Sequence, residues 1–215
     1  MSDDHPSSCT RWLRTIPRSP VGRQPWVTYE PMAVYDVRQF GDPVLRQIAA
    51  EVTIIDGALV KLTEDMVPTM VEEGGLGLAA PQIGVQKRLF VYDLRDGQGV
   101  KTLVNPVIRE SRGEWTYDEG CLSVRGLSWE IVRPKEVHIT GYDLDGREVS
   151  IEADDLMARL FQHELDHLDG KLLLDYLDDE QRADAMRTLR NRLLDAPTPT
   201  AKPRGSFGLS LPGLS

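Results

Sequence analysis

Apolar residues recur at the three- and four-residue spacing of an α-helix between residues 56 and 73, at Leu59, Leu62, Met66, Val67, Met70 and Val71. Asp56 is placed to cap the start of this helix, and Gly74-Gly75 to end it. Pro68 falls inside the segment, where it removes one backbone donor, so we expect a kink in the last turns.

The pattern changes to that of β-strands between residues 87 and 152. The expected strands are residues 88–93, 101–108, 137–144 and 147–153, with a further alternation at Leu127, Trp129 and Ile131. Asp145-Gly146 stands between the last two segments and favours a two-residue hairpin turn.

Two more helices are expected after the strands. The first opens at Asp154 or Asp155 and runs to about Asp169, with Gly170 as its stop. The second runs from near Asp179 to Leu194. Its features are a capping box of Asp178 with Gln181 and a buried stripe of Ala183, Met186, Leu189 and Leu193. Because strands and helices are segregated rather than alternating, we expect an α+β fold.

Composition narrows the class of protein. A chain of 215 residues fits one domain, and no segment approaches the roughly 18 apolar residues that a membrane-spanning helix needs. The net charge of −9 argues against specific nucleic-acid binding, which would need clustered Lys and Arg. Since the only cysteines are Cys9 and Cys121, no disulfide framework is expected, and we predict a reducing, cytoplasmic location.

Both ends differ from the middle. Residues 1–31 hold five prolines and four arginines without an apolar segment of the kind that marks a secretory signal, so we expect a flexible extension. Organellar targeting by this extension is the alternative interpretation, and Met32 is a second candidate start. Residues 195–215, rich in Pro, Gly and Ser, are expected to form a flexible tail.

The sharpest chemical motif is HELDH at residues 163–167. On a helix, His163 and His167 lie one turn apart on one face and can reach the same metal ion. Glu164 is rotated by about 100° and can stand beside a bound water instead. Leu156 and Leu160, upstream on the same helix, would add an apolar wall suited to an apolar substrate side chain.

Two imidazoles leave a catalytic metal site one protein ligand short. One class of HExxH metalloprotease takes a third His where this chain has Leu173, and the other takes a downstream Glu, for which Glu180 is awkwardly close. Cys121, in the segment EGCLS (119–123), is the better third ligand because a glycine and a turn-like setting favour its exposure. A thiolate nucleophile is the rival interpretation, and it would need His5 or His138 as partner.

A third motif is GLGLAAPQ (75–82), whose glycines and alanines let the backbone approach a ligand or another segment closely. Together, GLGLAAPQ, EGCLS and QHELDHLDG (162–170) resemble the three signature motifs of the peptide deformylases. The resemblance runs from about Tyr35 to Leu194, so we take residues 32–194 as a deformylase-like catalytic domain. It implies antiparallel strands around a central HExxH helix, with an N-terminal and a C-terminal helix.

The resemblance also implies the chemistry. In that family one Cys and two His hold the metal, and the reaction removes the N-formyl group from the initiator methionine of new polypeptides as formate. Cys121, His163 and His167 would then be the ligands and Glu164 the general base. The Gln82 amide and the Leu122 backbone N–H would stabilise the oxyanion.

The resemblance implies further that backbone groups of Leu76, Gly77 and Gly120 bind the peptide in an extended form, and that Leu156, Leu160 and Tyr117 line the methionine pocket. The metal would be Fe(II), with Zn, Ni or Co as alternatives. The expected partners are N-formyl-methionyl peptides and nascent chains, with a transient association with the ribosome. The chain departs from the family pattern at Arg125, where Pro is common, and at Ser128, which aligns with an Arg. An HExxH endopeptidase and a non-catalytic metal-binding homologue remain the alternative functions.

Overall fold

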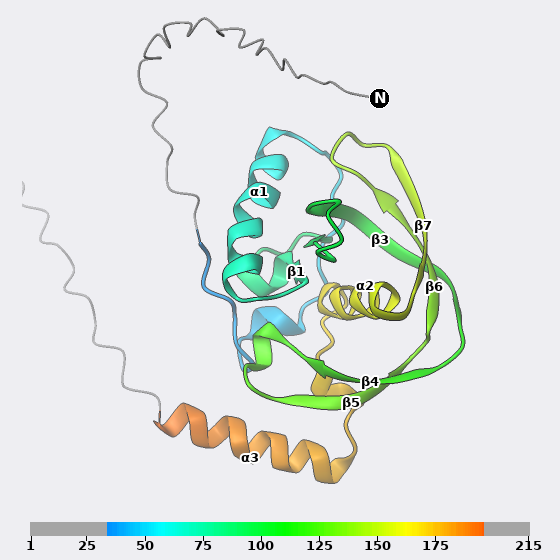
Figure 1. Cartoon of the computed structure of the whole chain (residues 1–215). Coiled ribbons are helices and arrows are strands. Elements are labelled where there is room, and N and C mark those ends of the chain that lie inside the picture. Colours follow the sequence, from blue (N-terminus) through cyan, green and yellow to red (C-terminus); the bar gives the residue numbers. More distant parts are fainter. Residues whose placement is uncertain (1–33, 196–215) are drawn as a thin grey trace, which may run out of the picture. The chain divides into compact units, whose positions relative to one another are not determined.

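The computed structural model describes residues 34–195 (Figure 1). The described helices are α1 (Gly57–Glu72), α2 (Asp155–Leu168) and α3 (Asp179–Asp195), with four 3-10 turns η1 (Pro43–Arg46), η2 (Ala80–Ile83), η3 (Leu122–Val124) and η4 (Leu173–Tyr176). The strands are β1 (Gly77–Ala79), β2 (Leu89–Tyr92), β3 (Lys101–Arg112), β4 (Trp115–Gly120), β5 (Ser128–Arg133), β6 (Glu136–Tyr142) and β7 (Glu148–Asp154). The predictions for residues 1–31 and for residues 196–215 of the tail lie outside the described residues.

The strands form two antiparallel sheets. Five of them lie in the order β1-β2-β3-β6-β7, and β4 pairs with β5 in a separate hairpin. With the three helices, this confirms the predicted α+β class with antiparallel strands. Of the described helices, none is long and apolar enough to cross a membrane.

Helix α1 starts and stops where the local signals predict. The Asp56 side chain accepts a hydrogen bond from the Leu59 N–H at 2.9 Å, and so satisfies one of the free donors of the first turn. Gly74 follows the helix at a φ of +73°, a conformation that costs little only for glycine. Pro68 lies inside the helix, which continues past it to Glu72.

Strand β4 was not predicted. Glu119 is its one buried side chain, while the other residues are exposed or half-buried, so no apolar alternation marks the segment. It is held instead by pairing with β5, from Trp115 opposite Arg133 to Gly120 opposite Ser128. The segment 75–82 contains strand β1 and the turn η2, and β1 contacts α2, so this part of the backbone does lie close to another segment.

The two-residue turn predicted at Asp145-Gly146 is wrong. Strand β6 ends at Tyr142 and β7 begins at Glu148, so the loop is longer. The Asp143 carboxylate accepts hydrogen bonds from the N–H groups of Asp145 and Arg147, both at 2.9 Å. Gly146 adopts a left-handed conformation with a φ of +76°, which lets the chain turn back into β7.

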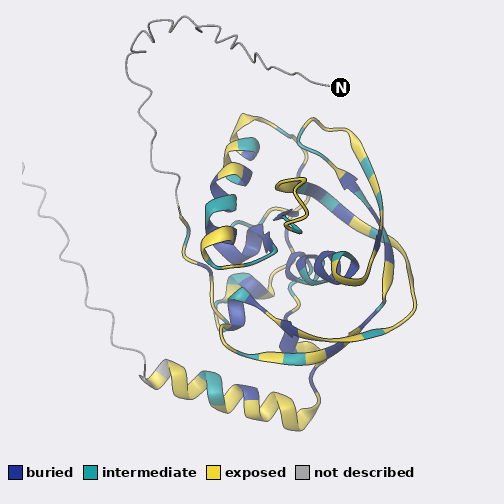
Figure 2. Cartoon of the chain, in the orientation of Figure 1, coloured by how far each residue is buried: buried dark blue, intermediate teal, exposed yellow. Residues whose placement is uncertain are grey.

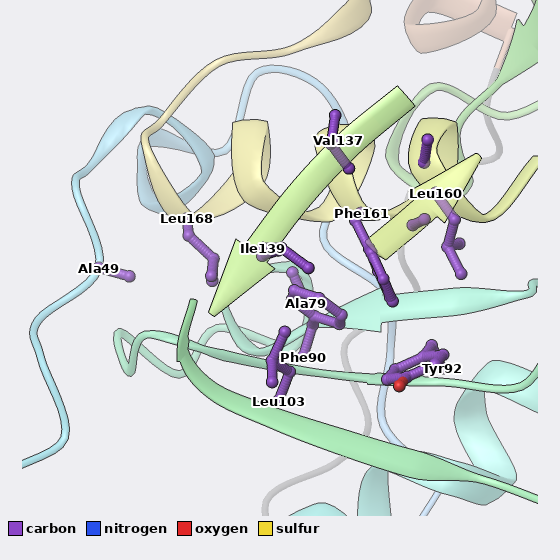
Figure 3. Packing of buried hydrophobic residues seen from close by; sticks show 12 residues of the cluster. Ala49, Ala79, Phe90, Tyr92, Leu103, Val137, Ile139, Leu160, Phe161 and Leu168 are labelled. Atoms are coloured by element: carbon purple, nitrogen blue, oxygen red, sulfur yellow. The ribbon is translucent and has the colours of Figure 1, made fainter. Parts of the chain in front are cut away.

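Helix α2 packs its apolar face into the main core. In Figure 1 it is flanked by β1, by the strands β6 and β7 and by the β4–β5 hairpin, and it contacts β1, β6 and β7. Figure 3 shows Phe161 of this helix beside Phe90 and Tyr92 of β2, with ring centroids 5.8 Å and 5.0 Å from that of Phe161. These contacts fix the rotation of α2, and with it the direction of its polar residues.

The buried stripe predicted for α3 is wrong. The capping box is confirmed, because the Gln181 N–H donates to Asp178 at 2.8 Å and the Asp178 N–H donates to Gln181 at 3.3 Å. However, Ala183 and Met186 are exposed, and the buried residue is Ala185. Figure 2 shows that most of the helix faces solvent. It therefore packs along a narrow face at Ala185 and Leu189, while the side chain of Leu193 lies outside the described residues.

Candidate active site

Three groups that can bind a metal converge from two elements. Cys121 follows strand β4, and His163 and His167 lie one turn apart on α2, with ring centroids 5.1 Å apart. One ligand atom from each residue lies within 4.8 Å of the other two. The Cys121 Sγ atom is 3.3 Å from His167 Nε2. The structure thus brings together the sulfur and the two imidazoles that the sequence singled out.

The charge of this group suits a cation. Burial alone would raise the pKa of the Cys121 thiol, but His167 and His163 outweigh it and hold that pKa well below its ordinary value. The thiolate is the form of cysteine that binds metals. Burial would lower the pKa of His163, yet hydrogen bonds to Cys121 and Glu119 raise it well above normal. The surroundings therefore favour positive charge at this point.

Glu119 holds His163 through the Nδ1 atom of the ring. Its Oε2 atom lies 3.1 Å from His163 Nδ1, so an Nδ1–H donates to the carboxylate and leaves the Nε2 lone pair free for a metal. The carboxyl group is buried, which favours its neutral form, but His163 and Arg133 lower its pKa to about 2. Glu119 is thus an ionised carboxylate that sets the orientation of one imidazole.

Two buried arginines complete this network. Arg133 donates to both oxygens of Glu119, at 2.7 Å and 3.1 Å, and also to Asp166 at 2.8 Å. Arg159 donates to Glu119 and to the carbonyl oxygens of Ile131 and Trp115. These roles could not be predicted from local sequence because the partners are far apart in the chain. Only the position of Glu119 in the EGCLS motif could have drawn attention to it.

Glu164 is buried beside the metal-ligand group. Its Oε2 atom has no hydrogen-bond partner within the described part of the chain, although the residue is only 3% exposed. Burial raises the pKa of Glu164, and the two imidazoles partly oppose this. A Cβ atom at Gly77 would collide with the Glu164 carboxylate, so the absence of a side chain at that position makes room for this group. A buried carboxylate with one unpartnered oxygen fits a site that holds a metal and a polar ligand.

Gln82 is oriented by its neighbours. The side-chain oxygen accepts a hydrogen bond from the Ala79 N–H at 2.8 Å, which turns the amide nitrogen toward Ser123 Oγ at 3.3 Å and Cys121 Sγ at 4.0 Å. Leu122 is the first residue of η3, where a backbone N–H has no acceptor within the helix. Both expected oxyanion donors thus lie next to Cys121.

A cavity of about 550 Å³ opens over this group. Leu160 is nearly buried in its wall, whereas Leu156 and Tyr117 are 40% and 44% exposed. Eleven of the residues that the sequence nominated line it, namely Leu76, Gly77, Gln82, Tyr117, Gly120, Cys121, Leu122, Leu156, Leu160, His163 and Glu164. His167, at 2% exposure, lies behind the cavity wall, beside Cys121.

The residues required by the rival interpretations lie elsewhere. Leu173 is buried in the same apolar cluster as Cys121, and Glu180 stands at the start of α3, outside the group of metal-binding side chains. The Nε2 atom of His138 forms a hydrogen bond with Ser150 Oγ at 2.8 Å on the β6–β7 surface, so it is not a partner for the Cys121 thiolate. His5 lies outside the described residues.

Comparisons with known proteins agree with one another. The family model described as polypeptide deformylase matches residues 34–183. A peptide deformylase of Acidothermus cellulolyticus is 51% identical over 159 residues, which cover 74% of this chain and 87% of that protein. One of Halothermothrix orenii is 46% identical over 144 residues, covering 67% and 94%.

Solved structures give the same result. The peptide deformylase of Legionella pneumophila is 38% identical with a TM-score of 0.72, and the match covers 77% of this chain and all of the other. That of Thermus thermophilus is 41% identical with a TM-score of 0.69, covering 75% and 96%. By sequence and by fold, the chain belongs to the polypeptide deformylase family.

Proposed function

We propose that this chain removes the N-formyl group from the initiator methionine of newly made polypeptides, and releases it as formate, at the site around Cys121, His163 and His167. Family membership supports the reaction. The observation that carries the assignment to this site is the convergence of one thiolate and two imidazoles beside the buried Glu164.

Cys121, His163 and His167 would hold one divalent metal ion at the HExxH helix α2, around which the strands pack. We propose Fe(II), with Zn, Ni or Co as alternatives, since a donor set of two nitrogens and one sulfur does not select among them. A bound ion of this kind lowers the pKa of a water molecule from about 15.7 to about 7 and polarises a carbonyl oxygen. Glu119 would keep His163 in the tautomer that presents Nε2.

Glu164 would act as the general base. It would take a proton from the attacking water and pass it to the departing amine as the C–N bond of the formamide breaks. The pKa of Glu164 is raised toward neutral pH, which suits a group that must both accept and donate a proton. Because a thiolate ligand donates charge to the metal, the reaction would depend more strongly on this base.

Gln82 and Leu122 would stabilise the negative charge that develops on the formyl oxygen. The Gln82 amide nitrogen is held toward Cys121, and the Leu122 N–H stands at the first position of η3, where the turn itself offers it no acceptor. Loss of one such donor typically lowers turnover by about 10²–10³.

The free edge of β1 would bind the substrate backbone. This strand pairs with β2 on one side only, and Leu76 and Gly77 line the cavity. An extended peptide could hydrogen-bond to Leu76 and Gly77 on one wall and to Gly120 on the other, in a way that tolerates many sequences. The methionine side chain would then enter the pocket of Leu156, Leu160 and Tyr117.

The test is formate release from formyl-Met-Ala-Ser by anaerobically purified, metal-analysed protein. Glu164→Ala should keep the metal and lose nearly all turnover, because the ligands are intact and the base is gone. Internal cleavage of casein would support the endopeptidase alternative, and metal binding without turnover would support a non-catalytic homologue. A cytoplasmic location and a transient encounter with the ribosome follow from a nascent-chain substrate and stay predictions.

A further inference from the structure

An ion pair joins the two walls of the cavity. Glu73, just after α1, pairs with Arg125, just after η3, and both residues line the cavity. The walls already approach closely beside this pair, because a Cβ atom at Gly75 would lie 2.9 Å from Leu122 Cδ1.

The backbone around both partners is held in place. Arg192 of α3 donates to the carbonyl oxygen of Arg125 and, at 3.2 Å, to that of Gly126. The Glu73 N–H donates to the Thr69 carbonyl at 3.1 Å, which anchors Glu73 to the last turn of α1. The charged groups therefore extend from anchored backbone positions, so forming the pair does not also require the backbone on either side to become ordered.

Few other charges on the cavity wall are available to a peptide side chain. Glu119 and Arg159 are buried and paired with each other. Asp118 is exposed and accepts a hydrogen bond from Ser128 Oγ at 2.9 Å. Among the described residues that line the cavity, the charges outside the metal-ligand group and Glu164 that a substrate can meet are Glu73, Asp118 and Arg125.

We propose that the Glu73–Arg125 pair determines which charge the cavity accepts at the second or third residue of the formylated peptide. This inference rests on the proposed deformylase function. With the pair intact, Glu73 offsets the positive charge of Arg125, and Asp118 leaves a small negative excess. Removal of Glu73 would leave Arg125 free to attract acidic side chains, and removal of Arg125 would leave two carboxylates to attract basic ones.

The experiment compares kcat/KM for formyl-Met-X-Ser and formyl-Met-Ala-X, where X is Asp, Ser or Lys. Glu73→Gln should raise the ratio of the Asp peptide to the Lys peptide by about two- to fivefold in at least one series, the range for exposed charge pairs. Arg125→Gln should lower the same ratio by a similar factor. Both shifts should shrink when the ionic strength is raised from about 0.02 to about 0.5 M, because salt screens exposed charges.

A second ion pair supplies matched controls. Arg112 and Glu136 form an exposed pair at 3.3 Å between β3 and β6, outside the cavity lining. Arg112→Gln and Glu136→Gln change the net charge as the test variants do, and should leave the ratio unchanged. Unchanged ratios in the test variants, or equal shifts in the controls, would overturn the inference alone. A wild-type chain that released no formate from any peptide would overturn the proposed function as well.

Discussion

Glu119 is the residue at which the metal-ligand group and the buried charge network meet. One oxygen faces His163, and both oxygens accept hydrogen bonds from Arg133, while Arg159 adds a third cationic partner. Burying a carboxylate is costly, but here every surrounding cation donates to it, so the charges compensate one another. The loss of this one charge should therefore affect both the metal site and the fold.

We expect Glu119→Gln to weaken metal binding by about 10- to 100-fold, the usual effect of removing a carboxylate that orients a ligating imidazole. The amide keeps the shape of the side chain, but Arg159 loses the carboxylate with which it pairs, and Arg133 keeps only Asp166. Competition with a chelator measures the affinity. Glu130→Gln, an exposed carboxylate on β5, is the matched control. Equal metal retention by both variants would contradict this role for Glu119.

Gly77 is the second residue with a specific prediction. An added methyl group would meet the Glu164 carboxylate and would lie 2.9 Å from Leu160 Cδ1. Gly77→Ala should displace the base and reduce kcat by about 10²-fold, the cost of a misplacement near 1 Å, with the metal content unchanged. Gly57→Ala is the control because a Cβ there meets nothing within 4 Å. If Gly77→Ala turned over substrate as fast as the wild type, catalysis would not depend on the position that Glu164 has in this structure.

At the scale of elements, α2 combines two tasks. Phe161 and Leu168 pack in the core, while His163 and His167 share a different face and Glu164 is rotated by about 100° from His163. Helix α3 is different, because little of it is buried and its residue Arg192 supports the rim of the cavity at residues 125 and 126. Its stability should therefore depend more on local capping than on packing.

Removal of the cap tests this. Asp178→Ala removes the acceptor for the Gln181 N–H and should destabilise α3 by about 1 kcal/mol, the typical value of an N-cap. Amide hydrogen exchange in α3 should become about fivefold faster, since about 1.4 kcal/mol corresponds to a factor of ten. Asp184→Ala, which removes an exposed ion pair with Arg187 on the same helix, is the control. Equal exchange in both variants would mean that packing, and not the cap, holds α3.

At the scale of the whole molecule, Tyr176 links the buried network to stability at high pH. Its hydroxyl donates to Asp166 at 2.8 Å, and Arg133 lies 4.7 Å from its ring centre. Burial, and then the charge of Asp166, raise the pKa of Tyr176 from 10.0 to about 12. Between these two values the unfolded chain releases the phenol proton and the folded chain keeps it. The contribution to stability is therefore complete below pH 10 and is lost as the pH rises to about 12.

Tyr176→Phe should make the free energy of unfolding fall less steeply over this range, because phenylalanine has no proton to release. Denaturant unfolding at intervals between about pH 9 and 12 measures the slope in both proteins. The variant should also be less stable below pH 10, where the lost hydrogen bonds to Asp166 matter. Parallel curves for the two proteins would contradict the assigned pKa.

Much of this protein could be predicted from local pattern. The ends of α1 followed from Asp56 and Gly74, the capping box of α3 from Asp178 and Gln181, and the shared face of His163 and His167 from their spacing on a helix. These features depend on residues within a few positions of one another, for which backbone geometry is nearly independent of the rest of the chain. The order of the three motifs was specific enough to identify the family.

Other features were decided only by the tertiary structure. Strand β4 has no apolar alternation, and the sequence of α3 did not show which of its residues would be exposed. Glu119 meets Arg133 and Arg159, and Glu73 meets Arg125, across 14 to 52 residues of chain. Such pairs leave no periodic pattern in the sequence. A charged residue is expected at the surface, and only the fold shows that it is buried beside a counter-charge. Local geometry thus specified the ligands on the helix, and long-range packing specified the side chains that orient them.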